Sequence, residues 1–267
     1  MDSADYQARF GGIGRLYGND GLDVLKNSTF AIIGIGGVGS WVAESLARSG
    51  VGHIVLMDLD DLCITNVNRQ IHALSCTIGQ SKSQAMANRI ADINPNVKVT
   101  CLDCFYTPNN AEKLFELQPD VIIDAIDSLN HKAHLIATCY RAKQPLISCG
   151  GAGGRIDPTQ IEVADLSKTY GDPLLSVLRK KLKQEYKLPL GEKSKKLKIP
   201  CVFSAEKPYY PTCDGAVSKE KDPQFAGKMK CDTGFGSITH ITGTFGFFMA
   251  AEAIKLLHKH KRPSISQ

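Results

Sequence analysis

A glycine-rich loop is the first feature of this sequence that could do chemistry. Gly34, Gly36 and Gly39 match the spacing G-x-G-x-x-G and follow an apolar run at residues 30–35. Glycine lets the backbone turn tightly and approach a phosphate, and a helix beginning behind the loop adds N–H donors and the positive end of its dipole. The loop therefore predicts a nucleotide phosphate site. A tight turn without a ligand is the alternative.

Charged residues follow the loop at positions where a nucleotide could meet them. Asp58 ends a second apolar run, where a carboxylate can accept hydrogen bonds from ribose hydroxyls. A nicotinamide enzyme and an ATP enzyme share these features. Arg69, within T-N-V-N-R-Q, and Lys82, at the start of the next expected helix, favour ATP. Fixed cations stabilise the charge on a departing pyrophosphate, which hydride transfer does not require. Either cation alone could instead form a surface salt bridge.

Asp127 completes the set of candidate catalytic residues. It follows the apolar run D-V-I-I-D-A-I at residues 120–126. Ligands bind outside the carboxyl ends of strands in open α/β sheets, and Mg²⁺ prefers hard oxygen ligands. We therefore predict that Asp127 holds a magnesium ion bridging the phosphates. Asp127 or Ser128 could also cap the following helix, and both roles can coexist.

Alternating strands and helices must position these residues. Short apolar runs predict strands at 30–35, 53–58, 97–102, 120–126 and 145–149, and helical patterns lie between them at 41–50, 82–93, 110–117 and 129–142. This alternation predicts an α/β fold, a Rossmann-like doubly wound and mostly parallel sheet with helices on both faces. Residues 156–164 are expected to form an edge strand or hairpin.

The chain is expected to be a single domain, residues 1–267, with an adenylating core at 20–155. Residues 167–230 are rich in Lys, Pro and Gly with weak periodicity, which predicts a substrate-facing insertion or lid. A C-terminal helix is expected at 236–260. Residues 241–257 are apolar but contain Glu252 and Lys255, and a membrane span needs about 20 apolar residues. A buried helix, with no stable membrane insertion, is expected there.

Composition places the chain among ordinary globular proteins. Its 267 residues are 43% apolar and 22% charged, enough to bury a sizeable core and too apolar for a disordered chain. Nine cysteines without a regular framework and a polar start without a signal peptide predict a reduced, cytoplasmic protein. The net charge of +5 is uneven, because residues 179–198 hold nine basic and two acidic residues. This basic segment suits a polyanion, although a solvated loop is the alternative.

The motifs occur in an order that resembles the ubiquitin-activating superfamily, which includes enzymes that adenylate sulfur-carrier proteins. They are G-I-G-G-V-G-S, the Asp58 strand end, T-N-V-N-R-Q, G-Q-S-K and D-A-I-D-S, and the resemblance covers residues 9–155. It implies an adenylating enzyme that uses ATP and Mg²⁺ and forms a homodimer. An arginine expected near the N-terminus aligns with Gly12, although Arg9 and Arg15 are nearby.

The resemblance also implies residue roles. Arg69, Lys82 and Asp127 would be catalytic, with Asp127 on the metal. The nucleotide-binding residues would be Gly34, Gly36, Gly37, Gly39, Asp58, Asn66, Asn68, Arg69, Lys82, Asp127 and Ser128. Ser128 stands where relatives usually have asparagine.

Departures from the sulfur-carrier pattern favour one branch of the superfamily. Sulfur-carrier relatives usually carry two C-x-x-C pairs that bind structural zinc, whereas Cys201, Cys213 and Cys231 stand alone, so zinc is not expected. The K-C-D-T-G-F-G run at 230–236 and the basic segment resemble a branch whose members act on a threonine-bearing adenosine beside the tRNA anticodon. The resemblance implies that ATP adenylates the threonine carboxylate. Attack from within the side chain then expels AMP and closes a ring, with net loss of water.

Three other functions remain open at this point. The chain could adenylate the C-terminus of a sulfur-carrier or ubiquitin-like protein, it could be a nicotinamide dehydrogenase, or it could be an RNA-binding module without enzymatic activity. Cys231 could be a reactive thiol linked to a sulfur-relay partner, although a buried structural cysteine is the simpler role.

Overall fold

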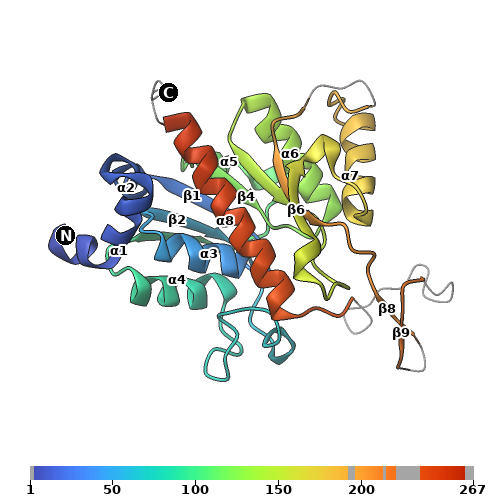
Figure 1. The fold of residues 1–267 in the computed structure, drawn as a ribbon, viewed down its shortest axis with the longest axis horizontal. Helices are drawn as coiled ribbons and strands as arrows, with labels where there is room; N and C mark the ends of the chain where they lie inside the picture. The colour runs from blue at the N-terminus through green and yellow to red at the C-terminus, as the bar shows by residue number, and fades with distance from the viewer. Residues whose placement is uncertain (1–2, 192–195, 213–214, 221–234, 262–267) are drawn as a thin grey trace.

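The computed structural model describes residues 3–191, 196–212, 215–220 and 235–261. Within these residues seven strands form one sheet in the order β3-β2-β1-β4-β5-β7-β6, and a two-stranded hairpin lies beside it (Figure 1). All neighbours in the large sheet are parallel except β6 and β7. The strands are β1 Thr29–Ile33, β2 His53–Met57, β3 Lys98–Leu102, β4 Val121–Asp124, β5 Leu146–Cys149, β6 Ile161–Asp165, β7 Pro200–Ser204, β8 Tyr210–Pro211 and β9 Val217–Ser218.

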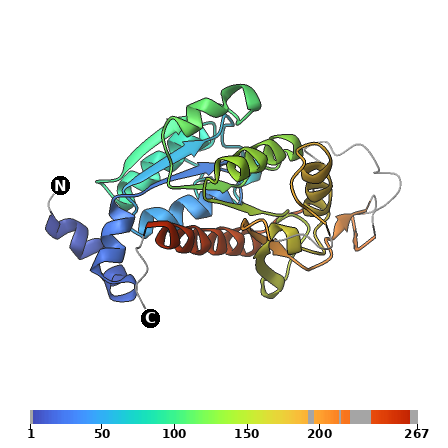
Figure 2. The same cartoon turned by 90° about the horizontal axis from the view of Figure 1, so that it is seen from above.

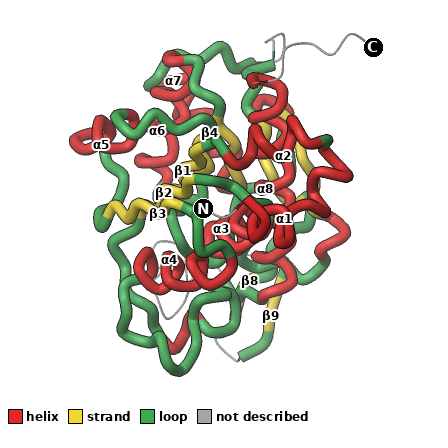
Figure 3. The backbone as a smooth tube through the Cα atoms, turned by 90° about the vertical axis from the view of Figure 1, so that its left-hand side faces the viewer, coloured by secondary structure: helices red, strands yellow, loops and turns green. Residues whose placement is uncertain are grey.

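Helices cover both faces of the sheet, as Figure 3 shows. One face packs against α3, α4 and α8, and the other against α5, α6 and α7. The helices are α1 Ser3–Tyr17, α2 Asn19–Lys26, α3 Gly39–Arg48, α4 Lys82–Ile93, α5 Ala111–Phe115, α6 Leu129–Ala142, α7 Pro173–Gln184 and α8 Thr239–Lys261. Short 3₁₀ turns lie at Ile64–Asn66, Pro108–Asn110, Pro158–Gln160 and Leu166–Lys168. The Rossmann-like, doubly wound fold expected from the sequence is confirmed.

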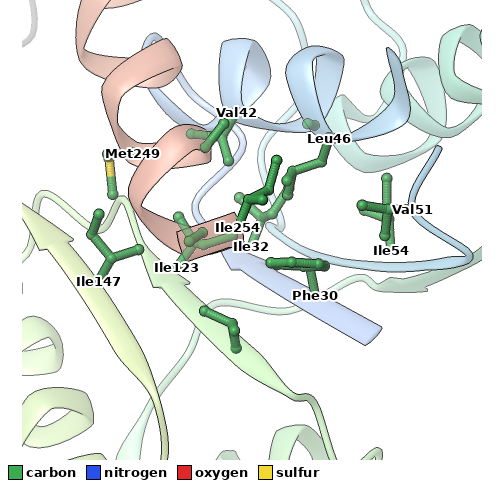
Figure 4. Packing of buried hydrophobic residues seen from close by; sticks show 14 of the residues in the cluster. Phe30, Ile32, Val42, Leu46, Val51, Ile54, Ile123, Ile147, Met249 and Ile254 are labelled. Carbon is green, nitrogen blue, oxygen red and sulfur yellow. The ribbon is translucent and has the colours of Figure 1, made fainter. Parts of the chain in front are cut away.

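Strand residues alternate between the two apolar layers. Phe30 and Ile32 pack under α3 and α8 (Figure 4), whereas Ala31 and Ile33 face the layer of α6 and α7. Successive side chains of a strand point to opposite faces, so a strand covered on both sides is apolar on both faces, except where a polar side chain has a buried partner as Asp124 does. This explains why the central strands appear in the sequence as continuous apolar runs.

The sheet changes winding direction at β1, which lies between β2 and β4. The connection through α3 leads from β1 to β2 on one face, and α6 leads from β4 to β5 on the other. The loops after β1 and β4 therefore diverge at the carboxyl edge of the sheet, where open α/β sheets bind ligands. The glycine loop and Asp127 follow these two strands.

The segment at 167–230, which the sequence predicts to be an insertion, contributes to the sheet itself. Its strand β7 lies between β5 and β6, so the sheet extends beyond the core expected at 20–155. Helix α7 is also ordered, with Asp172 accepting a hydrogen bond from the Leu175 amide at its start. The sequence pattern indicated neither element, because their apolar residues are few and stand among many lysines. β7 has only a short buried run, and α7 buries only Leu175, Leu178 and Leu182.

The two ends of α7 lie at opposite edges of the sheet. Its N-cap Asp172 accepts from the Gly151 amide just after β5, at the carboxyl edge. After its last turn the chain leads to the start of β7. Because β7 runs parallel to β5, that start lies toward the amino edge of the sheet. Beyond α7, the Tyr186 carbonyl accepts from Arg141 near the end of α6. The described part of the basic segment therefore lies toward the amino edge, away from the glycine loop.

Helix α8 crosses the whole face of the sheet (Figures 1 and 2). Its start contacts the loop after β2, and its last residue, Lys261, lies 2.9 Å from Asp120 before β4. The residues expected to form a buried C-terminal helix do form one, with Phe245, Met249 and Ala253 fully buried. Among the described residues, no helix is long and apolar enough to cross a membrane.

Candidate active site

The glycine loop connects β1 to α3 at the carboxyl edge. Gly34 has φ near +90°, and a β-carbon there would lie 2.8 Å from the Ala125 carbonyl oxygen. A β-carbon on Gly39 would lie 1.9 Å from the Gly34 carbonyl oxygen, whereas one on Gly36 would meet no atom of the described residues within 4 Å. Gly34 and Gly39 therefore serve the tight turn and the helix–strand approach, while Gly36 borders open space. The N-cap residue of α3 is Val38, and no side chain of the described residues makes a capping hydrogen bond there, so the positive end of α3 is available to an anion.

Asp58 joins the end of β2 to the glycine loop. Its carboxylate accepts from the Ile35 amide at 2.6 Å and from the Asp60 amide at 2.9 Å. The residue is buried, with 6% of its surface exposed. A carboxylate has about four acceptor positions, so Asp58 can hold the loop and still accept from a ligand hydroxyl.

Arg69 lies against the glycine loop. A β-carbon on Gly37 would be 3.5 Å from Arg69 Cδ, which places the arginine stem beside the loop. The Arg69 guanidinium donates to the Thr65 carbonyl at 2.7 Å and to Asn68 Oδ1 at 3.0 Å. These bonds leave donors of the guanidinium for an anion, because the group carries five N–H bonds.

The two predicted asparagines shape this loop. Asn66 is buried, and its Oδ1 accepts from the Cys63 amide at 3.1 Å, closing a local turn. Asn68 is exposed and donates from Nδ2 to the Ser237 carbonyl at 2.8 Å. In the structure both side chains therefore support the loop that carries Arg69.

Lys82 is the first residue of α4 and is almost fully buried. Its Nζ lies 2.7 Å from Asp60 Oδ2, and its side chain is 9% exposed against 52% for Asp60. Because Asp60 also bonds through its amide to Asp58, the pair connects Lys82 to the end of β2. The structure thus brings Asp58, Arg69 and Lys82 to one edge, together with the glycine loop.

Asp127 follows β4 and is exposed. Among the described residues, no hydrogen bond or ion pair engages its carboxylate. Ser128 occupies the N-cap position of α6, but its side chain makes no capping hydrogen bond. The capping role considered for Ser128 is therefore absent, and the Asp127 carboxylate is available to a ligand.

A buried ion pair lies under the Asp127 loop. Lys132 Nζ is 2.9 Å from Asp124 Oδ2 and donates to the Ile126 carbonyl at 2.9 Å, with both side chains fully buried. Asp124 also accepts from Ser148 Oγ at 2.7 Å. Burial lowers the pKa of the Lys132 ammonium, but the Asp124 carboxylate, together with the neighbouring Cys149 and Cys201, raises it above its usual value. Lys132 received no role from the sequence, because only the fold places it beside Asp124.

Residues 12–267 match the model of the ThiF family. This chain belongs to the ThiF family. It is 49% identical to an Escherichia coli (strain K12) protein named tRNA threonylcarbamoyladenosine dehydratase, over 94% of this chain and 93% of that one. A Haemophilus influenzae protein of the same name is 46% identical over 96% of each chain. A crystal structure of the Escherichia coli dehydratase in complex with ATP superimposes with a TM-score of 0.86 at 44% identity, covering 99% of this chain and all of that one.

In this ThiF-family chain the carboxyl edge combines complementary groups. An open glycine loop, Arg69 and Lys82 suit a polyphosphate, and Asp58 and Asp127 offer carboxylates to hydroxyls or a cation. Such a site can bind a nucleotide and stabilise charge that develops on its phosphates. Three members of the edge were missed by sequence reasoning, namely Trp41, Lys132 and Thr242, since contacts between distant residues define them.

The cysteines require one addition to the sequence interpretation. Cys101 and Cys104 do have the spacing C-x-x-C, although a pair by itself supplies only two of the four ligands of a structural zinc site. Among the described residues, no three His, Cys, Asp or Glu side chains are grouped to hold a metal ion. Cys139, Cys149 and Cys201 are buried, and burial raises the pKa of each thiol, to about 11 for Cys149. Cys213 and Cys231 lie outside the described residues.

Proposed function

We propose that this protein is an ATP-dependent dehydratase that cyclises threonylcarbamoyladenosine next to the anticodon of tRNA. The observation that carries this proposal is the similarity over nearly the whole chain, at 49% identity, to an enzyme named for that reaction. The carboxyl edge supports it, because an open glycine loop with Arg69 and Lys82 beside it matches what ATP requires. The ATP complex of a relative with the same fold supports the choice of nucleotide.

The reaction needs two displacements, and the chain's own residues serve the first. A threonine carboxylate oxygen attacks the α-phosphorus of ATP and pyrophosphate leaves, which gives an acyl-adenylate. Arg69 and Lys82 stabilise the negative charge that builds on the phosphates, and the glycine loop holds them by backbone N–H groups. Asp58 accepts from the ribose. The exposed Asp127 carboxylate is the group that would hold Mg²⁺, which neutralises phosphate charge when bound.

The second displacement is intramolecular. A nucleophile within the threonylcarbamoyl side chain attacks the acyl carbon, AMP leaves with the former carboxylate oxygen, and the nucleophile's proton passes to solvent. The ring product therefore lacks one water relative to the substrate. Because the nucleophile is tethered, well-oriented ring closure can reach an effective molarity of about 10⁵ M or more, and no protein thiol is required.

We infer further that the protein acts as a cytoplasmic homodimer with tRNA as its substrate. Arg9 and Arg15 lie on α1, which contacts the Gly50 carbonyl through Tyr6 and the Ile93 carbonyl through Arg9. Both carbonyls are near the amino edge, so an N-terminal arginine could serve a glycine loop only in a partner subunit. A sulfur-relay partner at Cys231 stays a prediction, as does the single-domain organisation.

Nucleoside mass spectrometry tests the proposed reaction directly. A tRNA that carries uncyclised threonylcarbamoyladenosine is incubated with the protein, ATP and Mg²⁺, then digested to nucleosides. We expect the nucleoside to lose the mass of one water, with AMP and pyrophosphate formed in step, and we expect Arg69→Ala and Asp127→Ala to abolish both. Pyrophosphate exchange that depends on a Gly-Gly-ended carrier protein instead of tRNA would support the sulfur-carrier function and overturn this one.

A further inference from the structure

The backbone carbonyl of Arg69 receives two side-chain hydrogen bonds from other elements. Trp41 on α3 donates from Nε1 at 3.1 Å, and Thr242 in the first turn of α8 donates from Oγ1 at 3.1 Å. The Thr242 hydroxyl has one proton, and the Arg69 oxygen is the nearest of three carbonyls around it, ahead of Thr239 at 3.3 Å and Ile238 at 3.4 Å. Two elements far apart in the sequence thus meet on a single atom of the Arg69 loop.

The residue before Arg69 is held by the same end of α8. Asn68 donates from Nδ2 to the Ser237 carbonyl at 2.8 Å, and the Asn68 carbonyl accepts from Thr239 Oγ1 at 2.6 Å. Asn68 Oδ1 in turn accepts from the Arg69 guanidinium at 3.0 Å. The start of α8 therefore fixes both the backbone of residues 68–69 and one contact of the guanidinium itself.

Small residues make this convergence possible. A β-carbon on Gly246 would lie 2.5 Å from Trp41 Cβ and 3.0 Å from the Val38 carbonyl oxygen, so glycine lets α8 approach α3 at this point. A β-carbon on Gly37 would lie 3.2 Å from Thr242 Cγ2. The Trp41 ring also packs edge-on against Phe247, with centroids 5.8 Å apart. The glycine loop, the Arg69 loop and α8 are thereby brought into contact.

We propose that Trp41 and Thr242 are positioning residues for Arg69, a role that rests on the proposed function of Arg69 as a phosphate ligand. The loop that carries Arg69 is irregular and partly exposed, with Ile64 and Val67 both exposed. The 3₁₀ turn at Ile64–Asn66 supplies only a few backbone hydrogen bonds to this loop. The hydrogen bonds from Trp41 and Thr242 therefore decide where the Arg69 backbone lies relative to the glycine loop. Misplacing a catalytic group by about 1 Å costs about 10²-fold in rate. Removing either donor therefore weakens phosphate stabilisation without touching the nucleotide.

The first test replaces the Thr242 hydroxyl. Thr242→Val keeps the shape and removes the donor, whereas Thr242→Ser keeps the donor. Thr244→Val is the matched control, because within the described part of the chain Thr244 Oγ1 bonds only to the His240 carbonyl of its own helix. For Thr242→Val we expect kcat/KM for ATP to fall about ten-fold or more. Thr242→Ser should restore it, and Thr244→Val should leave it unchanged. Thermal unfolding of all three shows whether the fold is intact.

The second test uses Trp41, the single tryptophan of the chain. Its fluorescence reports on the environment of the Arg69 carbonyl, so adding ATP to the native protein should change the emission, and Arg69→Ala should abolish the change. Trp41→Phe keeps an aromatic ring beside Phe247 and removes the donor. It should lower kcat/KM for ATP as Thr242→Val does, with a similar melting temperature.

A double-mutant cycle separates positioning of Arg69 from a general structural role. In the Arg69→Ala background, Thr242→Val should cause no further loss of ATP affinity, measured by calorimetry, because the side chain it positions is gone. A full, additive loss in that background would overturn the proposal, as would unchanged kinetics of Thr242→Val and Trp41→Phe in folded protein. If Arg69→Ala itself retains full activity, the proposed function of the site fails, which is a different outcome from either of these.

Discussion

The two edges of the central sheet handle charge in opposite ways. At the carboxyl edge, the pairs Lys132–Asp124 and Arg155–Asp172 have all four side chains at least 98% buried, and they hold the loops after β4 and β5. Toward the amino edge, Lys181–Glu185 and Arg9–Asp5 are one-turn pairs within exposed stretches of α7 and α1. The same residue types thus fix loop geometry at one edge and lie on a solvated surface at the other.

The difference between buried and exposed ion pairs is related to the function that each edge would serve. Burying an ion pair costs desolvation free energy, which is recovered only with good geometry and added hydrogen bonds, so a buried pair is weak evidence for stability alone. Each buried pair here also bonds backbone carbonyls or amides of the loop above it, as Lys132 does at Ile126 and Asp172 does at Gly151. The pairs therefore fix loops at the edge where we propose that the nucleotide binds. If the amino edge attracts a polyanion such as tRNA through charge alone, its side chains do not need to be held by buried ion pairs.

The largest expected effect is on stability, from Lys132→Met compared with Lys181→Met. Removing Lys132 leaves the buried Asp124 carboxylate without its counterion, which should lower the free energy of unfolding by about 3–5 kcal/mol. Removing Lys181 breaks a pair whose Glu185 is exposed, and Met keeps the apolar stem of the partly buried Lys181, so the change should cost less than about 0.5 kcal/mol. Urea unfolding of both variants measures the two values. Equal losses would mean that the two edges do not differ in the way described.

The next effect is kinetic, from Lys82→Ala at the carboxyl edge compared with Lys183→Ala on α7. Loss of one preorganised charge beside developing phosphate charge should lower kcat for AMP formation about 10²-fold to 10³-fold. Lys183 is exposed near the far edge, so its removal should leave kinetics at saturating tRNA unchanged. Steady-state AMP formation measures both. A similar loss in Lys183→Ala would place the amino edge in the nucleotide site.

A pH effect of intermediate size is expected from His72. The residue is 2% exposed, its two ring nitrogens have no partner among the described residues, and burial, with Lys82 and Arg89 nearby, lowers its pKa to about 4. Between pH 6.5 and about 4 the unfolded chain binds a proton that the folded chain does not. The free energy of unfolding therefore decreases as the pH is lowered through this window, by about 2 kcal/mol from pH 7 to pH 5.

The variant His72→Phe tests that assignment. It should flatten the dependence of the free energy of unfolding on pH, whereas His260→Asn, at the exposed end of α8, should leave the dependence as it is. Urea unfolding at pH 7 and pH 5 gives the comparison. An unchanged dependence in His72→Phe would show that other groups titrate in this range.

The smallest effect is expected from the exposed lysines of the basic segment. Replacing Lys180, Lys183 and Lys187 by Gln removes three charges near the amino edge. If they meet tRNA phosphates, binding should weaken a few-fold per charge, and the slope of log K against log salt should become shallower by about one for each phosphate that is no longer neutralised. Filter binding over a salt series measures this. Unchanged affinity and slope would leave the amino edge as a solvated surface only.

Sequence patterns predicted the first five strands and the helices between them to within a few residues. Runs such as residues 30–33 and 121–123 are continuous and apolar because both sides of those strands are covered. The patterns failed at β7 and α7, where lysines outnumber the few apolar residues that pack. They also gave no signal for α1, whose three glycines obscure a helix.

The candidate site shows the same division. The glycine spacing and the order of Asp58, Arg69, Lys82 and Asp127 could be recognised in the sequence, because the type of each residue carries its chemistry. Trp41, Lys132 and Thr242 could not, since their partners lie at Arg69 and at Asp124–Ile126. Nothing in the local sequence of a threonine or a tryptophan indicates which carbonyl it will meet.

By itself, the sequence determined the fold class, the family resemblance and the set of groups able to bind a nucleotide. These depend on residue type, short spacing and apolar periodicity, which are local properties of the chain. Only the tertiary structure decided that the described part of the basic segment lies toward the amino edge and that α8 begins on the Arg69 loop. Both depend on the direction in which distant elements pack, because β7 must run parallel to β5 and glycines must let α8 approach α3.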